Sequence, residues 1–125
     1  MMKNRLLTVA TAALLLLAGG LAAAGPAGAA DCPSGEFCAW TAADFQGQRA
    51  DWSGDDDGWE SYIADQDSSW ANHAISGPGT KDHVQVYSQA DLGGRMTICL
   101  APGQEVDHNS AADDSGASHT WAMSC

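Results

Sequence analysis

Basic residues are scarce in this chain of 125 residues, where 5 Lys and Arg stand against 16 Asp and Glu. Two of the five, Lys3 and Arg5, precede a long apolar stretch, and the remainder of the chain keeps only Arg49, Lys81 and Arg95. A protein with so little positive charge repels nucleic acid and anionic lipid, so we exclude binding to either as its function. The acidic excess keeps a protein in solution and by itself indicates no partner.

Motifs of catalysis are also absent. The chain has no G-x-S-x-G sequence, no phosphate-binding glycine loop and no H-E-x-x-H pair. Its four histidines and four cysteines show no spacing typical of a zinc site. We therefore expect a protein that is not an enzyme and requires no cofactor.

The first 30 residues have the composition of a secretory signal peptide. A basic start is followed by the apolar stretch 6–24, by the Gly25-Pro26 break and then by small residues. The stretch is nearly long enough to span a bilayer, so an uncleaved membrane anchor is the alternative. The small residues favour cleavage. We predict a signal peptide over residues 1–30 and one secreted, extracellular, monomeric domain over residues 31–125 that has no membrane contact after cleavage.

All four cysteines follow the apolar stretch, and they are Cys32, Cys38, Cys99 and Cys125. An even number in a small secreted chain predicts two disulfides, for which three pairings exist. We favour Cys32–Cys38, since the Pro-Ser-Gly between them lets the chain double back, and Cys99–Cys125, which ties the chain end to a strand. By loop-closure entropy the two bridges contribute about 2.4 and about 3.5 kcal/mol to stability.

Short alternating patterns replace helical ones in the part beyond residue 30. Period-2 patterns occur between clusters of Gly, Asp and Ser: Cys38 and Trp40 alternate with Phe37 and Ala39, and larger apolar residues alternate with their neighbours over residues 83–87 and 96–100. No stretch there has an apolar period of 3.6 residues. These patterns predict an all-β fold.

The second half of the domain repeats the first. Residues 40–47 (WTAADFQG) recur as residues 87–94 (YSQADLGG) at a constant offset of 47, and a serine follows in each half. We predict repeats near 36–75 and 83–125, each too small to bury a core alone. In each repeat the glycine allows a hairpin to fold over at positive φ, the aromatic packs beneath it, and the serine binds the bent backbone. These residues are Trp40, Gly47 and Ser69 in the first repeat and Tyr87, Gly94 and Ser118 in the second.

This constellation resembles the βγ-crystallin motif, which implies two Greek-key units forming one β-sandwich. The Cys32–Cys38 opening before Trp40 is similar to that of secreted bacterial proteins of peptidase inhibitor family I36, which are related to a streptomycete metalloproteinase inhibitor. The resemblance covers residues 32–125. Cys99 and Cys125 look like additions to the common pattern, which implies that Cys32 and Cys38 are each other's partners.

The resemblance also implies a Ca²⁺ site. The βγ-crystallin type of site has a six-residue sequence pattern: two Asn or Asp residues, two variable residues, a Ser or Thr, and a Ser. The copies here are 64–69 (ADQDSS) and 113–118 (DDSGAS), damaged at Ala64 and Ala117 respectively. Because the hydroxyl of one motif joins oxygens of the other in that family, we expect at most one Ca²⁺ ion. Its candidate ligands are Asp65, Ser68, Asp113 and Asp114, and we expect Ser68 together with Asp114 to complete the site. The alternative is that these Asp and Ser residues only cap turns.

Two functions follow from these observations. The first is a secreted inhibitor whose partner is an extracellular protease, in particular a metalloproteinase. The alternative is a structural or Ca²⁺-stabilised extracellular module without a protease target. Thermolysin-type enzymes favour a large apolar residue just after the scissile bond, so we assign the inhibitory loop to Cys99, Leu100, Ala101 and Pro102. The alternation of Met96, Ile98 and Leu100 also allows Leu100 to belong to the core.

Overall fold

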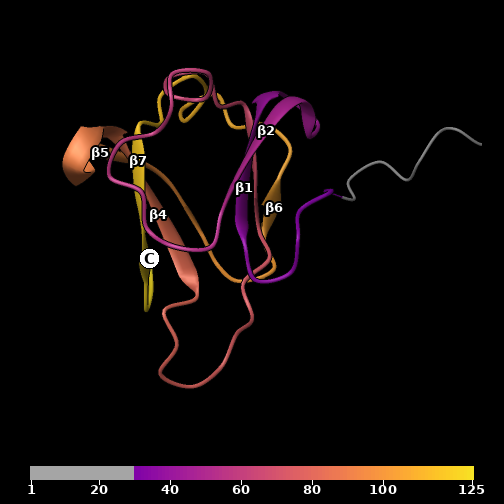
Figure 1. Ribbon diagram of the computed structural model, residues 1–125, viewed down its shortest axis with the longest axis vertical. Coiled ribbons are helices and arrows are strands. Elements are labelled where there is room, and N and C mark those ends of the chain that lie inside the picture. The colour runs from indigo at the N-terminus through magenta and orange to yellow at the C-terminus, as the bar shows by residue number, and fades with distance from the viewer. Residues whose placement is uncertain (1–29) are drawn as a thin grey trace, which may run out of the picture.

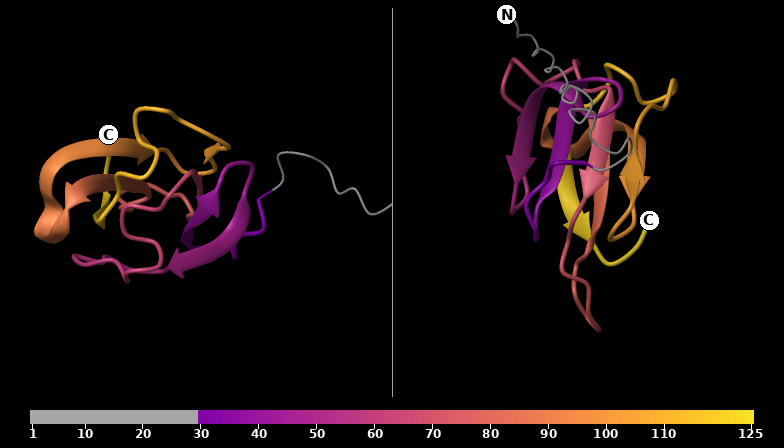
Figure 2. Two further views of the ribbon diagram at one scale, coloured as in Figure 1. Left: turned by 90° about the horizontal axis from the view of Figure 1, so that it is seen from above. Right: turned by 90° about the vertical axis from the view of Figure 1, so that its right-hand side faces the viewer.

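A computed structural model describes residues 30–125, so the signal peptide predicted for residues 1–30 lies, except for Ala30, outside the described residues. The described chain consists of two antiparallel β-sheets that face one another (Figures 1 and 2). Within it, no helix is long and apolar enough to cross a membrane. The elements are β1 (Phe37–Ala42), β2 (Gln46–Trp52), β3 (Ser69–Asn72), β4 (His83–Gln89), the 3₁₀ turn η3 (Ala90–Leu92), β5 (Gly93–Leu100), β6 (Glu105–Val106) and β7 (Ser118–Ala122).

The two sheets have the strand orders β2-β1-β3-β6 and β5-β4-β7, which confirms the predicted all-β sandwich of two units. Each repeat lends one segment to the sheet of the other. Strand β6 of the second repeat pairs with β3 of the first, and Asp56 of the first repeat forms a β-bridge with His119 of β7. Neither repeat therefore completes its sheet alone.

The core lies between the sheets and comes from the alternation along each strand. Val84, Val86 and Leu100 are fully buried on one sheet, and Phe37 and Trp70 are fully buried on the other. Side chains from the loop between β2 and β3 add to this core, namely Trp59 and Ile63. An aromatic stack runs through it, with ring centroids 5.3 Å apart for Phe37 and Trp52 and 4.8 Å apart for Trp52 and Trp59. Stacked aromatic pairs of this kind add to the stability that area burial supplies.

Both hairpins fold over in the same way. Ser69 Oγ accepts a hydrogen bond from Phe45 N at 3.0 Å and donates one to Ala42 O at 2.7 Å. Ser118 Oγ makes the matching pair in the β4–β5 hairpin, at 3.1 and 2.6 Å. Trp40 packs under the first hairpin, with its ring 5.2 Å from that of Phe45. The structure thus places both serines and Trp40 in the roles that the repeat predicts.

Gly47 and Gly94 occupy equivalent places in these hairpins, with φ angles of +82° and +73°. A Cβ atom on either glycine would collide with a hydroxyl, that of Thr41 at Gly47 and that of Ser88 at Gly94. Each hydroxyl instead accepts a backbone N–H from the opposite strand of its hairpin. Only glycine combines the positive φ with the absence of a side chain that this close approach requires.

Two disulfides join Cys32 to Cys38 and Cys99 to Cys125, which is the pairing favoured above. The first closes the turn that precedes β1, and its cysteines pack with Trp40 and Ala71 on the outer side of the first sheet. The second ties β5 to the last residue of the chain. Both ends of the described fold are therefore covalently fastened to a strand.

Candidate functional site

The segment between β3 and β4 extends beyond the ends of both sheets (Figures 1 and 2). We call residues 74–81 the projecting loop. It joins the two repeats and contains no acidic residue, although the chain has 16, and it carries the basic Lys81. The side chain of Ile75 on this loop is 73% exposed. The loop is therefore accessible to another protein.

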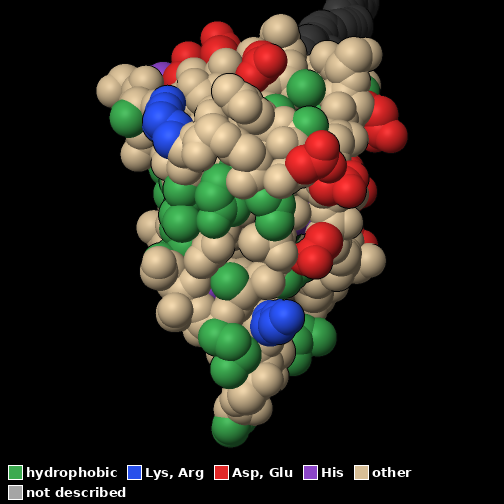
Figure 3. Space-filling view, turned by 90° about the vertical axis from the view of Figure 1, so that its left-hand side faces the viewer, with side chains coloured by type: hydrophobic (Ala, Val, Ile, Leu, Met, Phe, Trp, Pro, Cys, Tyr) green, Lys and Arg blue, Asp and Glu red, His purple; other side chains and the backbone are tan. Residues whose placement is uncertain are grey.

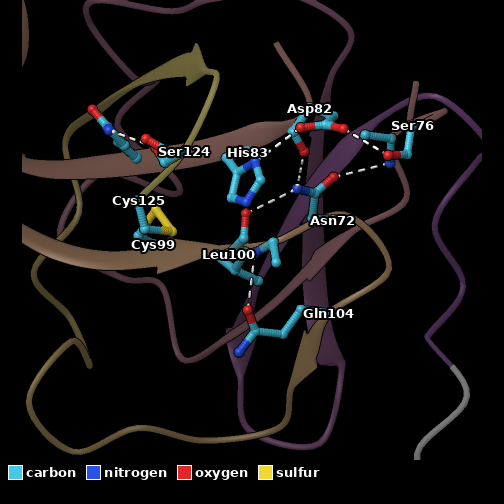
Figure 4. A network of polar contacts seen from close by, with 12 residues as sticks. Asn72, Ser76, Asp82, His83, Cys99, Leu100, Gln104, Ser124 and Cys125 are labelled. Carbon is cyan, nitrogen blue, oxygen red and sulfur yellow. Dashed lines mark hydrogen bonds and ion pairs between the residues drawn. A yellow bond between two sulfur atoms is a disulfide. The ribbon is translucent and has the colours of Figure 1, made fainter. Parts of the chain in front are cut away.

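One buried side chain holds both ends of the projecting loop. Asn72 Nδ2 donates hydrogen bonds to the carbonyl oxygens of Asp82 at 2.8 Å and of Leu100 at 3.0 Å. Its Oδ1 accepts the backbone N–H of Ala74 at 2.9 Å. Figure 4 shows Asn72 at the centre of this network. Because the amide is fully buried and all these partners are satisfied, it fixes where the loop leaves and rejoins the sheets.

A second set of contacts lies around the carboxylate of Asp82. Ser76 Oγ donates to Asp82 Oδ2 at 2.7 Å, and the ring Nδ1 of His83 lies 2.8 Å from Oδ1 (Figure 4). The hydrogen bond from Ser76, together with that from His83, holds the pKa of Asp82 below its usual value, although burial opposes this. The ionised carboxylate thus ties the inner part of the loop to the start of β4.

The turn closed by the first disulfide braces the base of the loop from outside. Gly35 N donates to His73 O at 2.7 Å, and His73 N donates to Glu36 O at 2.9 Å. The ring nitrogens of His73 lie 2.7 Å from Cys32 O and 2.6 Å from Glu105 Oε2. The loop base is consequently connected to the disulfide turn and to β6.

On the face of the molecule that Figure 3 shows, charged side chains are unevenly distributed around the loop. In Figure 3 the tapered lower end carries hydrophobic and basic side chains, whereas the acidic side chains of this face lie above it. A hollow beside the loop is lined by Ala74, Ile75, Lys81 and Trp121, among others. On this face, the lower end therefore presents less negative charge to a partner than the upper part does.

The structure corrects the inhibitory-loop assignment at Leu100. This residue lies in β5 opposite Val84, and its side chain has no exposed surface. Leu100 lies on the same face of β5 as Ile98, and this face packs against the core. The next residues form a tight turn in which Ala101 and Gln104 bond to each other. Leu100 thus cannot enter a protease pocket in this fold, and its assignment as the contact residue is wrong.

The two motifs predicted to bind Ca²⁺ lie side by side. Asp65 N donates to Gly116 O and Asp114 N donates to Asp67 O, each at 2.7 Å. The two segments therefore run in opposite directions in a fixed register. Both Asp65 and Asp114 have a positive φ, of 59° and 56°, which aspartate tolerates better than most residues.

Extending this register by one residue places Ser68 opposite Asp113, and at the other end Ala64 opposite Ala117. One end thus has a hydroxyl and a carboxylate, and the other has two methyl groups. Asp113 Oδ1 is buried and has no hydrogen-bond partner among the described residues, so this oxygen is not engaged by another protein group. Among the described residues, no three His, Cys, Asp or Glu side chains gather in a metal-binding cluster. Any cation here would rely on hydroxyl and backbone oxygens beside Asp113.

The comparisons with known proteins agree with this fold. The family model of peptidase inhibitor family I36 matches residues 25–99. This chain belongs to peptidase inhibitor family I36. The I36 chain is therefore a peptidase inhibitor at the level of its family, and not an enzyme. Its two disulfides are consistent with an extracellular protein.

Solved structures show the fold of this I36 protein independently. A βγ-crystallin from an archaeon is 25% identical with a TM-score of 0.56, covering 71% of this chain and 99% of its own. A structure from work on the evolution of the eye lens βγ-crystallin domain fold is 21% identical with a TM-score of 0.60, covering 74% and 91%. A βγ-crystallin from Ciona intestinalis is 18% identical with a TM-score of 0.55, covering 70% and 99%. No curated protein matches the I36 chain in sequence.

Sequence reasoning missed the residues that organise the candidate site in this I36 protein. Asn72 and Asp82 lie at the two ends of the segment between the repeats, and neither belongs to a motif that the sequence analysis singled out. Asp67 is buried as well, and it accepts hydrogen bonds from Ser115 N at 3.1 Å, Gly116 N at 2.9 Å and Trp70 Nε1 at 2.8 Å. The one available signal is position, since Asn72 and Asp82 directly bound the only segment that joins the repeats.

Proposed function

We propose that this protein inhibits an extracellular metalloproteinase by placing the projecting loop in the active-site cleft of the enzyme. The inhibitor activity in this proposal rests on membership of peptidase inhibitor family I36. The metalloproteinase target rests on the Cys32–Cys38 opening, which is similar to that of a metalloproteinase inhibitor. The observation that carries the proposal is the grip of Asn72 on both ends of the loop.

Rigidity of the loop is what inhibition requires physically. A flexible segment loses conformational entropy when it is ordered in a cleft, and each ordered backbone residue costs about 1–2 kcal/mol. A loop already held by Asn72, Asp82 and the disulfide turn avoids most of this cost, so more of the contact energy remains as affinity. The same contacts keep the loop from relaxing into a good substrate.

Inhibition assays against a panel of enzymes test this function. The full-length chain is expressed with its own N-terminus, purified from the culture medium, and mixed with a thermolysin-type, a subtilisin-type and a papain-type enzyme. We expect inhibition of the thermolysin-type enzyme alone, at near-stoichiometric protein. A parallel assay with added Zn²⁺ controls for removal of the catalytic metal by the acidic chain. Full activity of the metalloproteinase at excess protein would contradict the proposal.

A Ca²⁺-stabilised module is the second candidate, and the unpaired buried oxygen of Asp113 favours it. Hard carboxylate, hydroxyl and carbonyl oxygens are the ligands that Ca²⁺ prefers. We propose one ion between the two motifs, with Asp113 and Ser68 as its side-chain ligands and Asp114 next to Asp113, whereas Asp65 lies opposite Gly116 toward the other end. The pair Ala64 and Ala117 offers no oxygen at the equivalent position.

Calorimetry tests the Ca²⁺ proposal. We expect one binding event and a higher melting temperature with Ca²⁺, because a ligand that binds only the folded state stabilises it. Asp113→Asn and Ser68→Ala should each abolish the event, while Asp57→Asn in the acidic loop should leave it unchanged. A64D together with A117S should add a second event. Either no binding or two events in the natural chain would exclude the proposed site.

A further inference from the structure

We infer that Ile75 is the side chain that determines which protease this loop fits, and that Asn72 and Ser76 position it. This inference rests on the proposed inhibition of a metalloproteinase. Five large hydrophobic side chains are exposed among residues 30–125, and Ile75 has the highest exposed fraction, 73%, followed by Met123 at 55%. Ile75 alone of these five lies on the projecting loop. The remaining three are Tyr62, Leu92 and Met96.

The backbone at Ile75 is anchored on both sides. The residue before it is held through Ala74 N, which donates to Asn72 Oδ1 at 2.9 Å. The residue after it is held through Ser76 Oγ, which donates to Asp82 Oδ2 at 2.7 Å. One unanchored side chain thus stands between two fixed positions. Because isoleucine is β-branched and stiff at χ1, its side chain loses little further freedom in a pocket.

The rest of the loop leaves Ile75 accessible. The tip forms a turn closed by a hydrogen bond of 3.1 Å from Thr80 N to Gly77 O, and this places Ile75 on one arm of the loop rather than at its tip. No carboxylate lies between residues 73 and 81. An extended arm with a single large apolar side chain is the shape that an apolar pocket in a cleft accepts.

The chemistry of Ile75 indicates the class of partner. Thermolysin-type enzymes take a large apolar residue just after the bond they cleave, and Ile75 supplies one on a rigid arm. Leu100 was expected in this role, but it is buried in the core. The competing contact is Lys81, which would suit an enzyme with an acidic pocket instead. The exposed fraction and the double anchoring favour Ile75.

Titration of thermolysin with the full-length chain and three variants tests the specificity role. Ile75→Asp should weaken inhibition more than tenfold and leave the melting temperature unchanged, because the side chain is largely exposed. Ile75→Leu should retain inhibition. Met123→Asp, which changes another exposed hydrophobic residue away from the loop, should inhibit like the natural chain. This pattern would support Ile75 as the contact residue.

The positioning role is tested at Ser76, because Asn72 is buried and its replacement threatens folding. Ser76→Ala should weaken inhibition several-fold, and Ser76→Thr should restore it by returning the hydroxyl that Asp82 accepts. Equal inhibition by Ser76→Ala and the natural chain would overturn the positioning role.

The outcomes separate this inference from the function on which it rests. If the natural chain inhibits thermolysin and Ile75→Asp inhibits equally well, the role of Ile75 is overturned while the proposed function stands. If Lys81→Ala loses inhibition and Ile75→Asp does not, the role of Ile75 is overturned and Lys81 is the contact residue instead. If the natural chain leaves metalloproteinases fully active, both the function and the inference are overturned.

Discussion

Two glycines decide whether the hairpins can fold over. At Gly47 the φ angle is +82°, and a methyl group would collide with the Thr41 hydroxyl that binds the opposite strand. We predict that Gly47→Ala lowers the free energy of unfolding by about 1–3 kcal/mol, the cost of a strained backbone position. Gly58→Ala is the matched control, because a Cβ there meets nothing within 4 Å and the φ angle is not positive. Urea denaturation measures both, and equal stabilities would refute the prediction.

His119 is a buried ring whose two nitrogens have different partners. Trp59 Nε1 donates to its Nδ1 at 2.9 Å, and its Nε2 lies 2.8 Å from Gly54 O. The first contact requires a bare Nδ1 and the second a protonated Nε2, so the ring is neutral. Burial lowers its pKa from the usual 6.5, against the opposing hydrogen bond to Gly54 and the charges of Asp56 and Asp55.

Stability should therefore depend on pH through His119. Above its usual pKa of 6.5 the ring is neutral whether the chain is folded or unfolded. Below that pH, His119 binds a proton in the unfolded chain but stays neutral in the folded protein. The free energy of unfolding therefore falls as the pH falls. Urea denaturation at pH 7.5 and at pH 5.5, roughly one unit to either side, measures the decrease. His119→Gln should be less stable at the higher pH, since Trp59 loses its acceptor, but should show a smaller decrease. An identical decrease in the variant would assign the effect to other groups.

The projecting loop depends on one hydroxyl for its inner attachment. Ser76 is the largest cause of the lowered pKa of Asp82. We predict that Ser76→Ala raises this pKa toward the usual value of 3.8 and speeds amide hydrogen exchange across residues 74–81. Because a lowered carboxyl pKa stabilises the fold above the unfolded pKa and this stability is lost as the pH falls through the folded value, the variant should be less stable at neutral pH and should lose less stability on acidification. An NMR titration of Asp82 checks the shift, with Ser61→Ala as a control that leaves it unchanged.

Elements that depend on residues close together in the sequence were predictable. Elements that depend on pairing with residues far along the chain were not. The hairpins follow from Gly47, Gly94 and their serines, because a short repeated pattern specifies a short repeated bend. The pairing of β6 with the first sheet was not predictable, because a strand of two residues is too short to show an alternating pattern in the sequence. Leu100 was ambiguous for the same kind of reason. An apolar residue that follows a cysteine and stands two residues before a proline is compatible with a strand end or with a loop, and only the pairing with Val84 decides between them.

The candidate site was harder to predict than the fold. Asn72 acts through a buried amide that reaches Ala74, Asp82 and Leu100, and the last of these lies 28 residues away. No spacing rule connects such partners, because the topology brings them together. The Ca²⁺ motifs were recognisable in sequence, but their relative register, which sets Ser68 against Asp113, required the structure.

At the scale of the whole molecule, the two repeats share one core and two exchanged segments. We predict that replacing Cys99 and Cys125 together by Ser lowers the free energy of unfolding by about 3.5 kcal/mol, the loop-closure value for a bridge of this span. Amide hydrogen exchange should accelerate in β1–β3 as well as in β4 and β5, because neither sheet closes without the other repeat. Acceleration confined to the second repeat would contradict this shared stability.

The exchange of β6 also sets the order in which the chain can mature. A polypeptide is made from its N-terminus, yet the first sheet waits for residues 105–106, and the second disulfide waits for the final residue, Cys125. Residues of both repeats must therefore be present before the first sheet has all its strands.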